Sequence, residues 1–334
     1  MKEQLLKWAN ILGETGLFRL LCPGTLPVFM LHRVTDGNDG VPGRMTASQL
    51  RGYLQYLSNK RYQVLSMDEL WQSLDEGREI PSRSVLFTID DGFYDHHDVA
   101  AKVFDEFGFP LNFFVITGLL DQQLWPWDDQ VSYAFRNARV LRSDLELPSG
   151  AVFSVNLEEA SAETVIRELR DALKTGPQAE IYQWLREELF TKLEVDYPSS
   201  APEEYRPMSW SDARSLRERG HGVYPHTCSH RILSTLAPEE KRKEICDSLE
   251  RVGKELGYSP EVFAYPTGRP SDYDDQDVKE LRQAGFNMAF NTVPAYVRQG
   301  QDHYQLPRFS LPENTADFLQ IVNRFEALKE KLRS

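Results

Sequence analysis

The fold is decided by one stretch, Ser84-Val85-Leu86-Phe87-Thr88-Ile89-Asp90-Asp91-Gly92. Its first half is a short run of branched and aromatic residues, which is typical of a strand buried on both faces in a parallel sheet. Two adjacent carboxylates and a glycine end the run. Successive side chains of a strand point to opposite faces, so Asp90 and Asp91 cannot do the same job unless the backbone turns, and Gly92 permits a turn.

Ligands of α/β sheets bind beyond the carboxyl ends of the strands, so the position of this aspartate pair favours chemistry. The structural alternative is a helix cap beside a turn carboxylate. A second motif, His226-Thr227-Cys228-Ser229-His230, follows a short strand at 222–224 and favours the chemical interpretation. Two imidazoles four residues apart project to one side of a helical turn, and with one carboxylate they make a three-ligand site for a divalent metal.

These motifs resemble those of the polysaccharide deacetylases of carbohydrate esterase family 4, the NodB homology domain. Residues 88–92 match the family's Thr-Phe-Asp-Asp-Gly motif with Ile for Phe, and residues 226–230 match its His-Ser/Thr-x-x-His motif. The third motif of the branch that deacetylates exopolysaccharides is similar to Phe263-Ala264-Tyr265-Pro266-Thr267-Gly268. The resemblance extends from about residue 26 to 311 and is interrupted by one large insertion.

The resemblance implies roles for the motif residues. Asp91, His226 and His230 are the expected metal ligands, and Asp90 is the expected general base. Amide hydrolysis requires an activated water, which a divalent cation acidifies while it polarises the carbonyl, and a nearby carboxylate takes the proton. We expect zinc, with cobalt or nickel as alternatives.

Three further residues complete the expected catalytic set. The family's third motif usually includes an arginine that orients the base; none precedes Tyr265 here, and Arg308 could fill that role through a bidentate contact to Asp90. Tyr265 is expected to contribute its backbone N–H as an oxyanion donor. The usual C-terminal histidine motif is absent, so we predict His32, at the end of the first strand, as general acid in a permuted motif order. The alternative for His32 is a structural histidine that bonds a strand-end carbonyl.

Helices alternate with the strands along the chain, which predicts parallel strands and right-handed crossovers. The resemblance implies an α/β fold of the distorted (β/α)7 barrel type. The candidate strands are the one ending at the aspartate pair and those at 26–32, 62–65, 111–117, 222–224, 262–265 and 288–292. We expect a capping box at Ser66-Met67-Asp68-Glu69 and a closing helix at 316–332.

The domain organisation follows from where this alternation stops. We expect a single domain over residues 1–334, an amphipathic N-terminal helix at 2–21 and a helical insertion at about 120–207, after the fourth strand. The insertion leaves from a carboxyl strand end and can overhang the site, so we count Trp127 and Asp128 with Tyr265 and Pro266 as candidate substrate-binding residues. Trp127 could form a sugar-stacking wall or pack inside the insertion.

Charge and cysteine content narrow the function classes. The 334 residues include 38 Lys and Arg against 51 Asp and Glu, a net charge of −13. This argues against nucleic acid and against broad adhesion to anionic lipid. The N-terminal helix mixes both charges, so packing on the barrel or on a partner is favoured over membrane attachment. The cysteines, Cys22, Cys228 and Cys246, are too few for a disulfide framework, and no signal peptide is evident, so we expect a cytoplasmic protein.

The leading hypothesis is a metal-dependent N-deacetylase. Its substrate would be a glycan that contains N-acetylhexosamine, or a lipid-linked or nucleotide-linked precursor. Two alternatives remain: a degenerate deacetylase that binds glycan without cleaving it, and an amidohydrolase that acts on a small non-sugar amide, since fold and metal do not fix the substrate.

Overall fold

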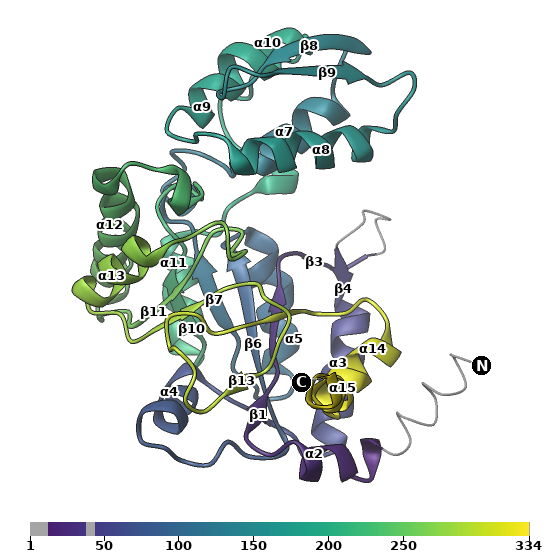
Figure 1. Cartoon of the computed structure of the whole chain (residues 1–334), viewed down its shortest axis with the longest axis vertical. Coiled ribbons are helices and arrows are strands. Elements are labelled where there is room, and N and C mark those ends of the chain that lie inside the picture. Colours follow the sequence, from purple (N-terminus) through teal and green to yellow (C-terminus); the bar gives the residue numbers. More distant parts are fainter. Residues whose placement is uncertain (1–12, 38–43, 334) are drawn as a thin grey trace.

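Six parallel strands form the central sheet of this computed structural model, which describes residues 13–37 and 44–333 (Figure 1). They are β2 (Val28–Leu31), β5 (Gln63–Val64), β6 (Ser84–Asp91), β7 (Asn112–Val115), β10 (Gly222–Pro225) and β14 (Phe309–Ser310). Hydrogen bonds order five of them as β10, β7, β6, β2, β14, and β5 pairs with the beginning of β6. The mixed α/β architecture predicted from the sequence is therefore present.

The register of the strands brings the two predicted motifs to one edge of the sheet. Asp91 on β6 pairs with Val115 on β7, which in turn pairs with Pro225 on β10. His226 directly follows Pro225, so the end of the aspartate strand and the start of the histidine motif are separated by a single strand. Because all three strands run in the same direction, their carboxyl ends share this edge.

Side chains of the strands alternate between two cores. Phe29, Phe87, Phe113 and Val223 belong to one buried cluster that also contains residues of the surrounding helices. The intervening residues of the same strands belong to a second cluster, which includes buried residues of two further strands, β11 (Val262–Ala264) and β12 (Met288–Phe290). Both faces of the sheet are therefore buried, with alternate residues on opposite faces, and one face shares its core with β11 and β12.

In the described residues the backbone ladders do not close into the expected (β/α)7 barrel. β11 and β12 form a parallel pair of their own, separate from the central sheet. Between β10 and β11, His226 Nδ1 donates to the carbonyl of Ala264 at 2.7 Å. Between β12 and β14, Arg308 Nε donates to the carbonyl of Asn291 at 3.0 Å. At the first seam the described strands have no ladder and the His226 side chain makes the contact, whereas at the second a single parallel bridge, Phe290 with Leu306, accompanies the Arg308 contact.

Helices surround the sheet, and their ends follow the sequence cues. The predicted capping box forms at Ser66, which accepts from the backbone N–H of Glu69, and a second capping box is found at Ser209. The main helices are α3 (Ala47–Asn59), α4 (Met67–Asp75), α5 (Ala101–Asp105), α11 (Trp210–Glu218), α12 (Pro238–Leu256) and α13 (Asp275–Ala284). Short strand pairs complete this part: β1 (Thr25–Leu26) with β13 (Val297–Arg298), and β3 (Val34–Thr35) with β4 (Met45–Thr46).

The insertion stands above the carboxyl edge of the sheet and has a hydrophobic core of its own (Figure 1). We predicted helices here, but the insertion also contains an antiparallel hairpin, in which only Leu145 and Val155 are buried. With one buried side chain per strand, the hairpin leaves little alternating apolar pattern in the sequence. The elements are α6 (Thr117–Leu120), α7 (Trp127–Arg136), β8 (Arg142–Glu146), β9 (Val152–Asn156), α8 (Ala162–Thr175), α9 (Ile181–Trp184) and α10 (Phe190–Lys192).

Both predicted terminal helices are interrupted. Residues 2–12 of the predicted helix at 2–21 lie outside the described residues; the described part turns at Gly16, whose φ is 89°, before α2 (Leu17–Leu21) begins. The predicted closing helix divides into α14 (Thr315–Val322) and α15 (Phe325–Arg333), with Arg324 between them at φ 69°. Arg324 is buried and donates to the carbonyls of Thr25 and Ser84. These contacts at the amino end of the sheet account for the break.

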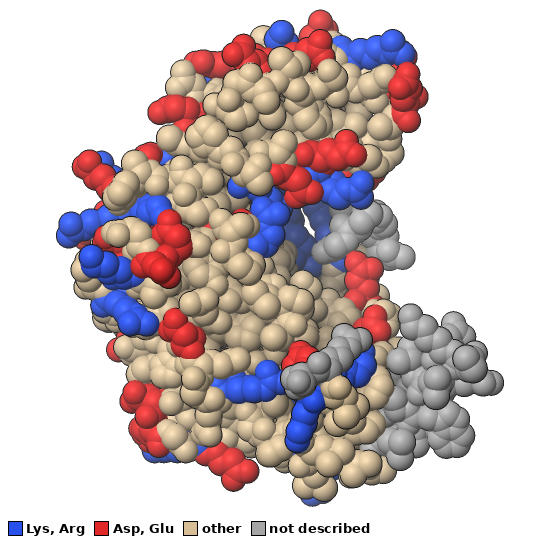
Figure 2. All heavy atoms as spheres, viewed as in Figure 1, with Lys and Arg blue, Asp and Glu red and all other residues tan. Residues whose placement is uncertain are grey.

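Acidic and basic side chains are interspersed over the face shown in Figure 2, and the surface is hollowed between the insertion and the rest of the chain. No helix among residues 13–37 and 44–333 is long and apolar enough to cross a membrane.

Candidate active site

The end of β6 directs its two carboxylates to different partners. Asp91 and Gly92 both have positive φ, 92° and 99°, so the backbone turns sharply directly after Asp90. A Cβ on Gly92 would lie 2.7 Å from Leu120 Cδ1 and 3.3 Å from Val115 Cγ1, so both the backbone angle and the space favour glycine. Asp90 and Asp91 are both buried, with exposed fractions of 2% and 8%. The turn thus allows neighbouring aspartates to do different work, as the sequence suggested.

The histidine motif is a loop and not the helical turn that we predicted. Thr227 and His230 have φ values of 66° and 55°, which excludes a right-handed helix. The hydroxyl of Thr227 accepts from the backbone N–H of His230 at 3.0 Å and stabilises the bend. The loop nevertheless turns both imidazoles toward Asp91.

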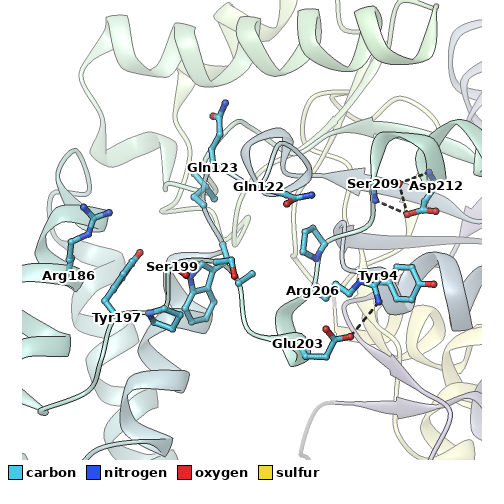
Figure 3. Close-up of a pocket in the computed structure, with 16 residues that line it drawn as sticks. Tyr94, Gln122, Gln123, Arg186, Tyr197, Ser199, Glu203, Arg206, Ser209 and Asp212 are labelled. Atoms are coloured by element: carbon cyan, nitrogen blue, oxygen red, sulfur yellow. Dashed lines mark hydrogen bonds and ion pairs between the residues drawn. The ribbon is translucent and has the colours of Figure 1, made fainter.

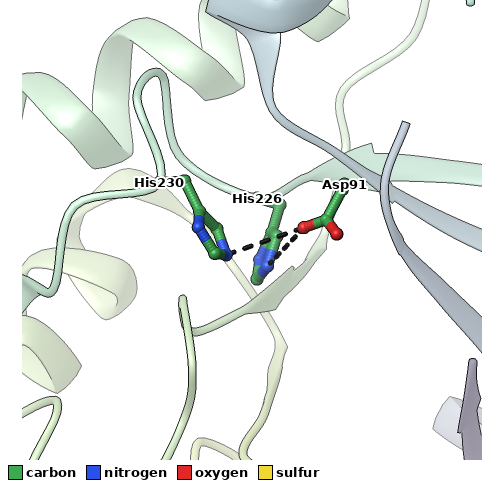
Figure 4. Close-up of side chains that lie close together, drawn as sticks. All are labelled: Asp91, His226 and His230. Atoms are coloured by element: carbon green, nitrogen blue, oxygen red, sulfur yellow. Dashed lines mark ion pairs between the residues drawn. The ribbon is translucent and has the colours of Figure 1, made fainter. Parts of the chain in front are cut away.

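Three ligand atoms meet at this point (Figure 4). Asp91 Oδ1 lies 3.6 Å from His230 Nε2 and 3.9 Å from His226 Nε2, and the three potential ligand atoms lie within 4.8 Å of one another. Nδ1 of His226 donates to the carbonyl of Ala264, whereas Nδ1 of His230 has no hydrogen bond among the described residues and faces Asp128 Oδ1 at 3.6 Å. A hydrogen on Nδ1 leaves the Nε2 lone pair free to bind a metal.

This donor set fits a divalent cation. Asp91 Oδ1 is buried and has no hydrogen-bond partner among the described residues, which is costly unless an ion satisfies it. Zinc bonds to nitrogen and oxygen are about 2.0–2.2 Å long, so ligand atoms of a tetrahedral zinc site are about 3.4 Å apart. The separations of 3.6 and 3.9 Å need only small adjustments of the side chains. One carboxylate and two imidazoles leave further coordination positions open.

Charges are crowded around the three ligand atoms. Burial raises the pKa of Asp91 to about 8, against the lowering effect of His230, and the carboxylates of Asp128 and Asp129 add to the rise. Burial lowers the pKa of His226 to about 3. Burial also disfavours the charged form of His230, but the Asp128 carboxylate outweighs burial and raises the pKa of His230 to about 9. The cluster has an excess of carboxylates that a bound cation would balance.

Arg308 reaches Asp90 from the seam between β12 and β14. Its Nη1 donates to Asp90 Oδ1 at 2.8 Å and to Thr88 Oγ1 at 3.1 Å. The expected bidentate contact is absent, because Nε is used by the carbonyl of Asn291 and Nη2 has no partner among the described residues. Burial would raise the pKa of Asp90, but the charge and hydrogen bond of Arg308 hold that pKa below its ordinary value. Asp90 is therefore kept ionised beside the ligand set.

His32 lies just beyond the end of β2. It keeps an exposed surface although protein atoms crowd around it. This crowding lowers the pKa of its imidazole, while the charge of Asp90 raises it and that of Arg308 lowers it. The backbone carbonyl of His32 accepts from Nε2 of the buried His96, which fixes the end of the strand. His32 is thus on the same edge as the aspartates.

The structure corrects two of the predicted contacts. The backbone N–H of Tyr265 donates to the carbonyl of Phe290 at 3.0 Å, so it is not free as an oxyanion donor, and the side chain of Tyr265 is completely buried. Pro266 is buried next to it. Trp127 is also completely buried, and its Nε1 donates to the carbonyl of His230 at 3.0 Å. A ring without exposed surface cannot stack on a sugar, so Trp127 supports the histidine loop instead.

Asp128 lies in contact with a predicted metal ligand and not on an open wall. Its carboxylate faces the Nδ1 of His230 at 3.6 Å, and its backbone carbonyl accepts from Arg170. In metal sites a carboxylate commonly lies beside a ligand histidine and orients its imidazole ring. His96, in the turn after the aspartate strand, is completely buried.

Sequence reasoning missed Glu244 on α12. The Glu244 side chain is 3% exposed. Its carboxylate accepts from the backbone N–H groups of Cys228 and Ser229, which lie between the two histidines. The available signal was periodicity, because Glu244 shares the buried face of α12 with Ile245 and Ser248. A charged residue in the phase of an apolar stripe indicates a buried partner.

A separate cavity of about 810 Å³ lies at the neck between the insertion and the rest of the chain (Figure 3). The ligand residues Asp91, His226 and His230 are not among the described residues that line it, so it is distinct from the candidate metal site. Its walls include Tyr94, Gln122, Gln123, Trp125, Tyr197 and Arg206.

Fold and site together define a class of hydrolase, and comparison with known proteins agrees. The family model for polysaccharide deacetylases matches residues 77–289, and the chain belongs to the polysaccharide deacetylase family. The family resemblance read from the motifs is thereby confirmed. The putative polysaccharide deacetylase YxkH of Bacillus subtilis (strain 168) is 18% identical over 286 residues, which cover 86% of this chain and 71% of that protein.

Solved structures of deacetylases have a similar fold. The Streptococcus pyogenes deacetylase PplD in complex with acetate aligns with a TM-score of 0.61 and 16% identity, over 90% of this chain and 99% of that chain. The structure of IcaB from Ammonifex degensii aligns with a TM-score of 0.58 and 16% identity, over 90% and 97% of the two chains. In both comparisons the similarity covers 90% of this chain and nearly all of the other chain.

Proposed function

We propose that this protein is a divalent-metal-dependent N-deacetylase that acts on N-acetylhexosamine residues of a glycan or of a glycan precursor. The observation that supports this most directly is that the two adjacent aspartates at the end of β6 face different partners. Asp91 faces two imidazole nitrogens within ligand distance, whereas Asp90 faces Arg308 and is kept ionised. One carboxylate is thus suited to hold a metal and the other to accept a proton.

Asp91, His226 and His230 would hold the cation. When bound, the cation supplies Lewis acidity, which polarises the acyl oxygen of the substrate and acidifies water. We propose zinc, with cobalt and nickel as alternatives that the same ligands accept. We also propose that the two parallel ladders are parts of one distorted seven-stranded barrel, opened at the seams that His226 and Arg308 fill.

The remaining steps are assigned to side chains of the chain itself. Asp90 takes the proton from the attacking water, because a carboxylate with a low pKa is available as an acceptor at neutral pH. Arg308 fixes the Asp90 carboxylate through Nη1 and holds that orientation through its contacts with Thr88 and Asn291. His32, on the same sheet edge as the two aspartates, is assigned to deliver a proton to the departing amine. The acetate and the free amine are then the products.

Two measurements on the purified protein test this function. The bound metal is quantified by mass spectrometry, and acetate release is measured with N-acetylglucosamine oligomers and with small cyclic amides. We expect Asp90→Asn to keep its metal and to lose turnover by about 10²- to 10⁴-fold, the usual contribution of a general base. His230→Ala should lose metal and turnover together. The proposal would be wrong if Asp90→Asn kept near wild-type turnover or if only the cyclic amides were hydrolysed.

A further inference from the structure

The loop between the two histidines has its polar groups gathered on one carboxylate. Glu244 Oε2 accepts from the backbone N–H of Cys228 at 2.8 Å and of Ser229 at 2.9 Å. Its Oε1 accepts from the hydroxyl of Ser229 and from Arg231, whose Nε and Nη2 lie 3.1 and 3.0 Å away. One side chain on α12 therefore accepts from two consecutive residues between His226 and His230, and from Arg231 directly after His230.

Because Glu244 is buried, its carboxylate needs all of these hydrogen-bond donors. The Glu244 side chain is 3% exposed, and a charge so far from water is tolerated only when several donors surround it. Hydrogen bonds to an ionised acceptor are also stronger than those between neutral groups. The carboxylate therefore fixes the loop more firmly than a neutral side chain could.

The insertion holds the same loop from the other side. The hydroxyl of Tyr182 donates to the carbonyl of Ser229 at 2.6 Å, and Trp127 Nε1 donates to the carbonyl of His230 at 3.0 Å. Arg231 Nη1 donates to the carbonyl of Ala179 at 3.0 Å, which joins the Glu244 contacts to the insertion. The insertion thus supplies donors to the carbonyls of the loop, whereas Glu244 on α12 accepts from its backbone N–H groups.

The loop needs such support because its conformation is unfavourable by itself. Thr227 and His230 are not glycine, yet both have positive φ, which costs about 1 kcal/mol or more at each residue. Relaxation of the backbone would rotate the imidazole of His230 away from Asp91. External contacts must therefore hold the ligand geometry in place.

We propose that Glu244 is a positioning residue that sets the affinity of the site for its metal. It does not touch the ligand atoms and acts through the Cys228–Ser229 backbone. The proposal rests on the metal site of the proposed function. It goes further because it places a determinant of metal affinity on the outer helix α12. It also assigns the insertion a role in holding the histidine loop.

The test compares Glu244→Gln with Glu240→Gln. Glu240 also pairs with Arg231, at 2.9 Å, but it has no contact with the loop between the histidines, so its variant controls for a weakened Arg231. Cobalt is titrated into each metal-free protein by competition with a chelator of known affinity, and the visible cobalt spectrum reports the ligand geometry. Unfolding temperature and far-UV circular dichroism are measured on the same samples.

We expect Glu244→Gln to bind cobalt about 10- to 100-fold more weakly than wild type, with a changed cobalt spectrum, whereas Glu240→Gln stays within about twofold. Ser229→Ala removes the hydroxyl contacts with Glu244 and Arg231 but keeps the backbone hydrogen bonds to Glu244. It should show a smaller loss of cobalt affinity, and it replaces Glu244→Gln in the test if that variant does not fold. The proposal is overturned if the cobalt affinity of Glu244→Gln or, in its place, Ser229→Ala equals that of wild type. It is also overturned if Glu240→Gln loses as much cobalt affinity as Glu244→Gln does. A wild-type protein that binds no cobalt would refute the proposed function itself.

Discussion

The Nη1 of Arg308 lies 2.8 Å from the Oδ1 of Asp90, and the two side chains have exposed fractions of 0% and 3%. These residues are separated by more than two hundred positions in the chain, and the seam between β12 and β14 is what allows the arginine to reach the strand end. Charges in a site of this kind interact strongly because little water screens them. The arginine therefore controls both the orientation and the ionisation of the carboxylate.

Replacing Arg308 by Lys should impair catalysis without removing metal. An ammonium group cannot reproduce the contacts of Nη1 with Thr88 and of Nε with Asn291, so the Asp90 carboxylate would be less firmly oriented. We expect kcat to fall about 10- to 100-fold, the scale of a modest misplacement of a catalytic group. The pKa of Asp90 should rise, so the acid limb of the pH–rate profile should move to higher pH.

A suitable control is Arg282→Lys, because Arg282 is exposed and pairs only loosely with Asp302 at 3.4 Å. Its pH–rate profile should match that of wild type. If Arg308→Lys left both kcat and the acid limb unchanged, Arg308 would have no part in orienting the base.

His96 should make folding stability depend on pH. Burial lowers its pKa from 6.5 to about 4, while Asp95 and the carbonyl of His32 raise it and Arg33 lowers it. The folded state therefore favours the neutral imidazole, so the stabilisation is complete above pH 6.5 and is lost as the pH falls from 6.5 toward 4. A pKa difference of this size corresponds to about 3 kcal/mol of unfolding free energy.

Glutamine at this position separates the effect of His96 from that of other titrating groups. The amide of His96→Gln can still donate to the carbonyl of His32, but it does not titrate. Urea unfolding at pH 7.5 and at pH 5.0 should show a smaller stability difference for this variant than for wild type. Equal differences in the two proteins would mean that His96 already titrates normally in the folded state.

Much of the fold and of the site could be read from local sequence. The alternation of strands and helices, the capping boxes and the two motifs depend on neighbouring residues, and the parallel register then brings Asp91 and His226 to one edge. The closeness of Arg308 to Asp90, expected from the family resemblance, agrees with the topology, because β14 lies beside β2 at that edge.

The errors concern groups whose partners are distant in the chain. The backbone N–H of Tyr265 is used by Phe290, and the indole of Trp127 bonds the carbonyl of His230, neither of which a motif reveals. The histidine loop was expected to be a helical turn because i, i+4 spacing is typical of helices, but Glu244 and the insertion hold it in another conformation. A sequence pattern therefore predicts which residues meet more reliably than it predicts the backbone that presents them.

The assignment of His32 as general acid can be tested through the leaving group. An amine leaves an acylated carbon only after it gains a proton, whereas the phenolate of an aryl acetate leaves without one. His32→Gln should therefore lower kcat about 10²- to 10⁴-fold on N-acetylglucosamine oligomers and leave the hydrolysis of an aryl acetate nearly unchanged. Metal content should stay at the wild-type level, because the structure gives His32 no place among the ligand atoms. Equal losses on both substrates would indicate damage to the site as a whole, and unchanged turnover on the amide would leave His32 as a strand-end residue whose carbonyl holds His96.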